Sequence, residues 1–377
     1  MSEVTARTTA IENVVSSVSC VELYLQEAVT GLAQLRLILH GAASYGRLDI
    51  LEWAHERGYS HACSVETFNS AVEHGQLAAW IWLQDHGCLS AFAACDNAAR
   101  HGNLDILLWL RANRCPWDYR TCSNAALGGH FHILQWARAN GCPWDENVCS
   151  YAALGGHLNI LQWARANGCP WDENTCSSAA MGGYLYILQW ARESGCPWDE
   201  YTCSHAAGNG HLNTLLWARA NGCPWDKNTC ANAAGGGHLN ILQWARGNGC
   251  PWNEYTCSRA ASSGNLNILQ RARANECPWD RGTFSVAAMC GNLNVLQWLR
   301  ANGCPWNERT CSDAALKGHI DTLQWARANG CPWNEKTCSN VAESGYLDIL
   351  QWARANGCPC DEEYCSTYSG RWESGNG

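Results

Sequence analysis

Apolar and polar residues follow a helical spacing in a unit that recurs along most of the chain. In the copy that begins at Leu158, apolar residues at positions 158, 160, 161, 163 and 164 form one broad stripe, which is typical of an amphipathic helix. Gly168 suits the left-handed end of that helix, and Pro170 prevents its continuation. The pattern therefore predicts a helix that ends at Gly168.

A second, shorter helix is predicted at residues 175–181. Asp172 or Asn174 can cap its N-terminus, and Gly182 and Gly183 then turn the chain back. Each unit is therefore expected to be a helix–turn–helix followed by a short loop.

The unit repeats every 27 residues. A Cys-Pro pair marks the copies at Cys115, Cys142, Cys169, Cys196, Cys223, Cys250, Cys277, Cys304, Cys331 and Cys358. A turn glycine marks twelve copies, at Gly46, Gly75, Gly102, Gly129, Gly156, Gly183, Gly210, Gly237, Gly264, Gly291, Gly318 and Gly345. A fixed period of this size marks an array in which each unit buries its apolar face against its neighbours. The sequence thus predicts an all-α solenoid of about twelve repeats.

The two ends depart from the period. Residues 1–40 hold two apolar stretches, at 21–29 and 32–40, which we interpret as helices of an N-terminal capping segment, because the first unit of an array needs a modified outer face. Residues 41–365 form the predicted solenoid. Residues 366–377 form a polar C-terminal tail, and a final capping helix with a frayed end is expected after Cys358.

The unit resembles the ankyrin repeat, whose pattern is roughly T-P-L-H-x-A-A-x-x-G-H-x-E-I-V-x-L-L-L-x-x-G-A-D-V-N. Residues 174–180 match the first-helix motif, Gly156-His157 reproduces the Gly-His turn, residues 159–165 match the second helix and residues 168–172 match Gly-Ala-Asp-Val-Asn. The resemblance covers about residues 41–365. Its short units rich in Cys and Trp look like the ankyrin arrays of protists and large DNA viruses.

The sequence departs from the ankyrin pattern in two places. The family period is about 33 residues, and the deletion falls between Asp172 and Asn174, where the family carries the tip of a β-hairpin. We therefore expect loops in place of hairpins and an almost purely helical solenoid. Arg165 stands where the family has Leu. The resemblance implies non-enzymatic binding of a protein partner on a concave face lined by the first helix and the loop before it.

Charge and composition narrow the possible partners. The formal net charge is -9, and only three residues are Lys. This balance argues against nucleic acid, whose binders usually carry a basic stripe. No run approaches the roughly 18 apolar residues of a membrane helix, and the first residues lack the pattern of a signal peptide. We expect a monomer in the cytoplasm, with the nucleus as the alternative.

The 25 cysteines of the chain would suit a disulfide scaffold in a small secreted domain. Eighteen of them, however, occupy two repeat columns, those of Cys115 and Cys122. A column is a packing position copied many times, so we expect free, buried thiols in a reducing compartment.

No catalytic or metal motif emerges, so no catalytic residue and no cofactor is predicted. The cysteine spacing is C-x6-C, unlike the C-x2-4-C of zinc sites, and equivalent cysteines of adjacent units should lie about 10 Å apart. Cys358, Cys360 and Cys365 remain the alternative metal site. Five histidines share a position that Asn or Tyr fills in other units, which favours turn capping over catalysis: His130, His157, His211, His238 and His319.

Two further columns have structural interpretations. The arginines equivalent to Arg138 are followed seven residues later by acidic residues such as Asp145, so we expect a ladder of surface ion pairs at helix ends, with anion binding as the alternative. The tryptophans equivalent to Trp136 and Trp144 are expected to pack in the core and between repeats. An aromatic binding ladder is their alternative role.

The positions that vary between units indicate where a partner would bind. Column one, in the middle of the first helix, contains Asn124, Tyr151, Ser178, His205, Asn232, Arg259, Val286, Asp313 and Asn340. Column two, just before that helix, contains Arg120, Asn147, Asn174, Tyr201, Asn228, Tyr255, Gly282, Arg309 and Lys336. All of these except Val286 and Gly282 are the predicted partner-binding residues. Neutral drift at exposed sites would give the same variation.

The sequence therefore favours a scaffold or adaptor that binds a protein partner and is not an enzyme. An adaptor that recruits substrates to a ubiquitin-type degradation complex is the first alternative. A metal-binding protein is the second.

Overall fold

The computed structural model describes residues 13–27, 31–87 and 94–360. Within these ranges every regular element is helical and no strand is present, which confirms the all-α prediction. One helix, α2 (Val18–Glu27), precedes the array. A 3-10 helix, η1 (Tyr59–Ala62), lies in the loop between α4 and α5.

The remaining helices form twelve pairs. The first helices of the pairs are α3 (Leu32–Ser44), α5 (Val65–Glu73), α7 (Ala94–His101), α9 (Tyr119–Leu127), α11 (Asn147–Gly155), α13 (Glu173–Met181), α15 (Glu200–Gly208), α17 (Lys227–Gly235), α19 (Glu254–Ser262), α21 (Arg281–Met289), α23 (Glu308–Leu316) and α25 (Glu335–Ser344). The second helices are α4 (Leu48–Glu56), α6 (Leu77–Asp85), α8 (Leu104–Ala112), α10 (Phe131–Ala139), α12 (Leu158–Ala166), α14 (Leu185–Glu193), α16 (Leu212–Ala220), α18 (Leu239–Gly247), α20 (Leu266–Ala274), α22 (Leu293–Ala301), α24 (Ile320–Ala328) and α26 (Leu347–Ala355).

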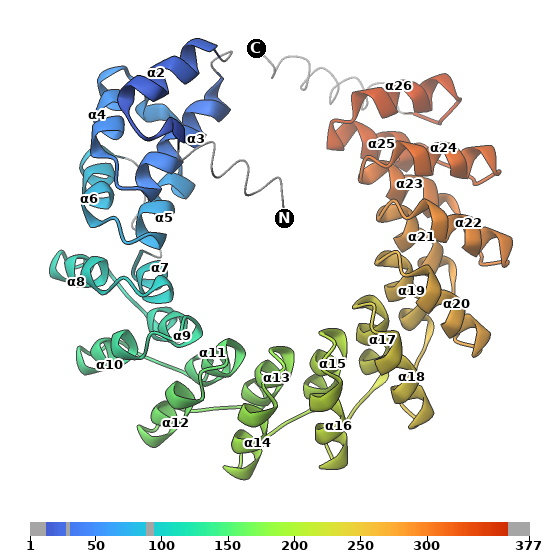
Figure 1. Cartoon of the computed structure of the whole chain (residues 1–377). Helices are drawn as coiled ribbons and strands as arrows, with labels where there is room; N and C mark the ends of the chain where they lie inside the picture. The colour runs from blue at the N-terminus through green and yellow to red at the C-terminus, as the bar shows by residue number, and fades with distance from the viewer. Residues whose placement is uncertain (1–12, 28–30, 88–93, 361–377) are drawn as a thin grey trace. The chain divides into compact units, whose positions relative to one another are not determined.

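The pairs fall into two compact units, which meet between Thr175 and Cys176. Within each unit the first helices stack directly side by side, and each second helix packs on the first helix of its own pair. In both units the row of first helices lies on the inner side of the curve that the pairs follow (Figure 1). We call the two sides the first-helix face and the second-helix face.

Small residues on the first helices explain this close stacking. In α11 the fully buried residues include Cys149, Ala152 and Ala153, and in α12 they are Ile160, Leu161 and Ala164. Alanine side chains let neighbouring backbones approach, while the larger aliphatic residues of the second helix fill the space within the pair. Because each repeat buries these residues only against its neighbours, the core runs along the array.

The helix ends largely follow the sequence prediction. The side chain of Asp118 accepts a hydrogen bond from the backbone N–H of Arg120 at the start of α9, and Asn253 does the same for Tyr255 in α19. Asp172 likewise accepts from the backbone N–H of Asn174 at 3.1 Å. Asn174 is therefore not the cap. Its amide also donates to Asp172, at 2.7 Å.

The predicted ends of the array are only partly covered by the structure. α3 continues past residue 40 to Ser44 and packs on α4, so it is the first helix of the first pair. The proposed boundaries at residues 40 and 365 stay predictions. Residues 361–377, where a final capping helix and a polar tail are expected, lie outside the described residues. Among the described helices, none has the length and the apolar composition needed to cross a bilayer.

The histidine column has a different role from the predicted turn capping. His130 and its equivalents stand at the N-cap position of the second helix, but their side chains make no capping hydrogen bond. Instead the His130 ring packs over Gly102 of the preceding repeat, and its Nε2 lies 3.0 Å from the Arg100 carbonyl oxygen. A β-carbon at Gly102 would come within 2.5 Å of the ring, and φ is +84° there, so both geometry and contact require glycine.

The arginine column also has partners other than the predicted acidic residues. Arg138 donates to the carbonyl oxygen of Cys142, and its guanidinium lies over the Trp144 ring, 4.1 Å from the centroid. The same guanidinium–indole contact recurs in nine repeats, at Arg111, Arg138, Arg165, Arg192, Arg219, Arg246, Arg273, Arg300 and Arg327. The ion-pair ladder is therefore wrong for Arg138. An indole neutralises no charge but offers a polarisable face to the cation.

The tryptophans link adjacent repeats through edge-to-face contacts. The loop residue Trp144 meets Trp163 of the next second helix with a centroid distance of 5.8 Å. Six other repeats repeat this contact, at Trp117–Trp136, Trp198–Trp217, Trp225–Trp244, Trp279–Trp298, Trp306–Trp325 and Trp333–Trp352. Each loop indole thus lies between an arginine of its own repeat and a tryptophan of the following repeat. Both tryptophans are half-buried, so they form the outer wall of the array.

The two cysteine columns meet inside the array. Cys122 of α9 lies beside Cys142, twenty residues later, and the thiol of Cys142 also donates to the carbonyl oxygen of Asp118 at 3.3 Å. Burial raises the pKa of the unpaired Cys304 thiol to about 12. A shared hydrogen bond with Cys196 and burial raise the pKa of Cys176. No cysteine of the described ranges forms a disulfide bond, and protonated thiols of this kind are inert.

Candidate binding face

Column one lies on the first-helix face, between neighbouring first helices. Most of its residues are half-buried, and several bond across to the preceding repeat. The amide of Asn340 donates to the Ser312 carbonyl oxygen at 3.0 Å, and the amide of Asn232 donates to the Ser204 carbonyl oxygen at 3.5 Å. These residues therefore contribute to stacking while presenting the rest of the side chain to the surface.

Column two lies at the start of each first helix, just after the N-cap residue. Six of its predicted binding residues are exposed and two are half-buried. The exposed ones are Arg120, Asn174, Tyr201, Tyr255, Arg309 and Lys336, and the half-buried ones are Asn147 and Asn228. Their backbone N–H groups bond to the cap, so in this column only the side chains are available to a partner.

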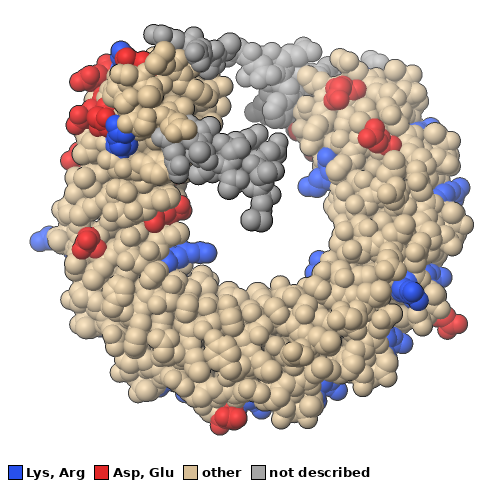
Figure 2. Space-filling model, viewed as in Figure 1, with Lys and Arg blue, Asp and Glu red and all other residues tan. Residues whose placement is uncertain are grey.

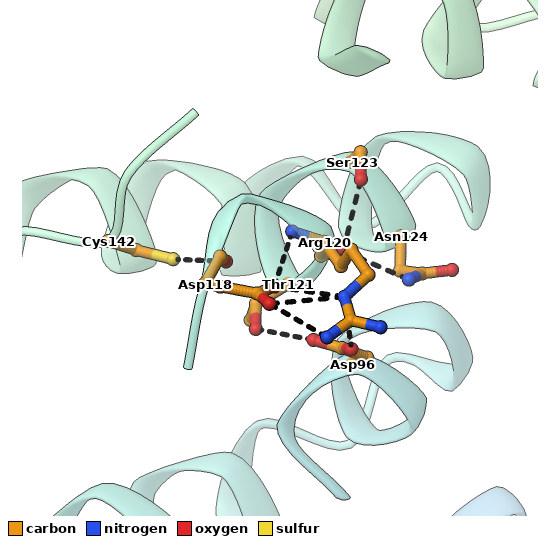
Figure 3. A network of polar contacts seen from close by, with 7 residues as sticks. All are labelled: Asp96, Asp118, Arg120, Thr121, Ser123, Asn124 and Cys142. Atoms are coloured by element: carbon orange, nitrogen blue, oxygen red, sulfur yellow. Dashed lines mark hydrogen bonds and ion pairs between the residues drawn. The ribbon is translucent and has the colours of Figure 1, made fainter. Parts of the chain in front are cut away.

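A polar network in the first unit engages one member of each column (Figure 3). Arg120 forms an ion pair with Asp118 at 2.9 Å and approaches Asp96 of the preceding repeat at 3.7 Å. Asp96 is buried and accepts a hydrogen bond from Thr121 at 2.7 Å, and desolvation raises the pKa of its carboxyl group. Asn124 donates to the Arg120 carbonyl oxygen. Arg120 is therefore already neutralised by carboxylates of its own chain.

The second unit contains a cleft where three column-one residues converge. His205, Asn232 and Arg259 come from α15, α17 and α19, and they line a hollow of about 480 Å³. Arg259 donates to the side-chain oxygen of Asn232 at 3.2 Å and lies over the Tyr255 ring at 5.5 Å. In the part of the chain that the structure describes, no carboxylate pairs with Arg259. The cleft also has no Asp or Glu in its lining.

Small residues open this cleft. Its lining includes Gly208, Gly235 and Ser262, which occupy one helical position in three successive repeats. In other repeats the same position holds Leu127, Leu154, Met181, Met289, Leu316 or Glu343. The sequence analysis missed this position because it followed changes of polarity between units. A comparison of side-chain volume down the column shows the signal.

The cleft favours an anionic group. Arg259 is exposed and is a fork of five donors, and only one contact to an amide oxygen and one to a ring occupy it. The buried Nδ1 of His205 has no hydrogen-bond partner among the described residues. Asn209 and Ser263 add polar groups at the edge. Asn232 and Arg259, both predicted binding residues, thus lie together here with His205.

The remaining surface gives no sign of a strongly charged interface. Lys, Arg, Asp and Glu side chains are scattered over the visible face of each unit without a continuous stripe of either sign (Figure 2). Among the described residues no group of three or more His, Cys, Asp or Glu side chains converges in a way that could hold a metal ion. Cys365, a member of the alternative metal site, lies outside those residues.

Together the fold and this face define a class of protein: a helical repeat array with a period of about 27 residues, consistent with ankyrin-like repeats. No protein-family description matches the sequence, and no curated protein is detectably similar to it.

Similar solved structures are helical repeat proteins of low sequence identity. One is the pentatricopeptide repeat protein PPR10 in complex with an 18-nt psaJ RNA element, with 16% identity and a TM-score of 0.38 over 98% of this chain and 66% of that chain. PPR10 from maize gives a TM-score of 0.36 at 16% identity, over 98% of this chain and 67% of that chain. The human ASB11 ankyrin repeat domain gives 14% identity and a TM-score of 0.34, over 42% of this chain and 84% of that chain. These values are too low to indicate what this chain binds.

Proposed function

We propose that this chain is a non-enzymatic scaffold that binds a protein partner on its first-helix face, and that an acidic side chain of the partner enters the cleft at Arg259. The observation that carries the proposal is the cleft itself: three variable residues converge on a hollow that contains an arginine and no acid. An unpaired guanidinium beside an empty space is a hydrogen-bonding fork suited to a carboxylate.

The location of the cleft supports a binding role over drift. Neutral drift at exposed positions would change side chains without hollowing the surface. Here three consecutive repeats carry a small residue at one position, and the cation lies at the same place. Glycine within a helix costs about 0.5–1 kcal/mol relative to alanine, so two such glycines reduce stability in exchange for the open space.

The test fills the cleft or reverses its charge. Gly235→Leu restores a residue that other repeats carry, and a β-carbon there would lie 3.5 Å from the Arg259 side chain, an ordinary contact. Arg259→Glu reverses the charge. Gly247→Ala on the second-helix face is the matched control, because a β-carbon at Gly247 meets nothing within 4 Å.

Affinity capture from cells, followed by direct binding measurements with the purified partner, gives the answer. We expect one protein to bind the native chain and the Gly247→Ala variant, and to bind both cleft variants at least tenfold more weakly. A partner that binds all four chains equally contradicts the proposed site. Capture that depends on nucleic acid, and disappears on ribonuclease treatment, contradicts a protein partner.

A further inference from the structure

The second-helix face carries a gap in the tryptophan ladder. In the repeat that begins at Gly264, Arg271 stands where equivalent repeats have the second-helix tryptophan. The loop residue Trp252 keeps its contact with Arg246, whose guanidinium lies 4.1 Å from the ring centroid. The indole that would meet Trp252 from the next repeat is missing. The side of Trp252 that is covered in the other repeats therefore faces open space.

A cleft of about 500 Å³ occupies that space, between α18 and α20. Its lining consists of Leu239, Leu242, Gln243, Arg246, Gly247, Trp252, Arg271, Ala272 and Asn275. Two repeats further along, 54 residues later, seven of these nine positions hold the same residue type. The two differences are Gly247, which is Ala301 there, and Arg271, which is Trp325 there. Both changes replace a larger apolar side chain or remove one, and together they create the cleft.

The lining combines an aromatic wall with two cations. Trp252 and the two leucines offer an apolar surface, and Arg246 and Arg271 supply positive charge without any Asp or Glu among the lining residues. Arg246 is engaged with Trp252 and the Cys250 carbonyl oxygen. The Arg271 side chain is exposed and forms no ion pair among the described residues. An occupant should therefore present a ring to Trp252 and a negative charge to Arg271.

We propose that this cleft binds a small aromatic carboxylate, with its ring in the place of the missing indole and its carboxylate paired with Arg271. Aromatic rings gain from edge-to-face or offset contact beyond the area they bury, and a carboxylate suits the planar fork of arginine. A volume of about 500 Å³ lies within the roughly 300–1,000 Å³ of small-ligand sites. The cleft is only one repeat wide, which favours a small molecule over an extended peptide.

This inference is independent of the proposed partner-binding face, because the two clefts lie on opposite faces of the array. A ligand here would fill the contact that the repeat lacks and would tie α20 to α18. Binding should therefore also stabilise this repeat, since anything that binds only the folded state stabilises it by mass action.

The test uses N-acetyl-5-fluorotryptophan as the probe and follows its ¹⁹F NMR signal on the purified full chain. We expect saturable binding to one site. The corresponding amide, which lacks the carboxylate, and N-acetyl-leucine, which lacks the ring, should each bind about tenfold more weakly or not at all. The 22 tryptophans of the chain make the fluorine signal preferable to intrinsic fluorescence.

Substitutions at the cleft make the result specific. Arg271→Trp restores the residue of the other repeats and should abolish binding, while Arg271→Ala keeps the space and should weaken binding about tenfold by removing the charge. Arg259→Ala, which removes a cation from the opposite face, should leave the affinity unchanged. Unaltered binding to the Arg271→Trp variant overturns the proposal, and so does equal affinity for the acid and its amide. Absence of binding at millimolar probe overturns it as well. A peptide with adjacent aromatic and acidic residues that binds tenfold more tightly than the probe would identify a protein segment as the ligand instead.

Discussion

Replacing Asp313 with asparagine should stabilise the protein at neutral pH. Asp313 is a column-one residue of α23 with a relative exposure of 8%, and its Oδ2 has no hydrogen-bond partner among the described residues. Burial raises the pKa of its carboxyl group, although Arg309 and a hydrogen bond with Ser285 partly oppose the shift. An asparagine at the equivalent position, Asn340, donates to the carbonyl oxygen of Ser312 in the preceding repeat. Asp313→Asn should place the same amide opposite Ser285.

The size of the effect follows from the two contributions. Leaving a buried polar group unsatisfied costs about 1–3 kcal/mol, and a new hydrogen bond adds about 1 kcal/mol. The folded-state pKa is raised, so the unfavourable contribution of Asp313 grows as pH rises from the unfolded value near 3.9 through the folded value. The gain from Asp313→Asn should therefore be about 1–3 kcal/mol at pH 7 and should shrink towards pH 4.

Urea unfolding of the full chain at pH 7 and pH 4 measures this difference. Asp321→Asn is the matched control, because Asp321 is exposed on α24 and removes the same charge from the same repeat. Equal stabilisation by the control would show that net charge, and not burial, is responsible. A loss of stability in Asp313→Asn would show that the carboxylate is well solvated by Arg309 and would refute the reasoning.

Three further predictions concern the array. Thiol titration of the denatured, anaerobically purified protein should approach all 25 cysteines, and a count lower by ten or more would contradict free thiols. The repeat from Gly264 to Cys290 should open first in native-state hydrogen exchange, because Arg271 leaves a cleft and Glu276 adopts φ of 63°, which costs a non-glycine residue about 1 kcal/mol. Arg271→Trp with Glu276→Gly should slow exchange at 266–275 and 283–289, and uniform protection across the array would refute a weak repeat. Burial lowers the pKa of His130, so its contribution to stability should be present above the unfolded value near 6.5 and lost as pH falls through the folded value. His130→Asn should make unfolding less sensitive to pH between 7 and 5, and an unchanged pH profile would exclude this residue as a cause.

The fold was predictable because its determinants are local and repeated. The apolar stripe at 158–164, the glycine stop at Gly168 and the Asp172 cap each act within one unit. The period then multiplies one correct interpretation along the chain. The expectation that Glu276 takes the place of a left-handed glycine is also confirmed by its positive φ.

The contacts between units were less predictable, because a sequence shows each residue beside its own neighbours and not beside the next repeat. His130 was assigned to its own turn but covers a glycine 28 residues earlier. Arg138 was paired with acids seven residues later but stacks on Trp144, six residues later. The pairing of Cys122 with Cys142 crosses the second helix and leaves no trace in the C-x6-C spacing.

The candidate clefts were visible in the sequence only in part. The polarity of His205, Asn232 and Arg259 marks a variable surface, but the space between them comes from glycines at another helical position. The loss of tryptophan at Arg271 was visible as a weakened contact. That the loss leaves a lined cleft depends on Gly247, one repeat earlier, and on the direction of the Trp252 ring.

The contacts between repeats have a direction, and this bears on how the chain is made. The ring of His130, the thiol of Cys142 and the hydroxyl of Thr121 all bond to groups that lie earlier in the sequence. A repeat emerging from the ribosome thus brings with it the groups that complete its predecessor, and it requires nothing that has not yet been synthesised. The array can therefore grow from its N-terminal end by successive docking of finished pairs. At every stage of synthesis only the most recent repeat has an uncovered turn glycine and unsatisfied carbonyl groups.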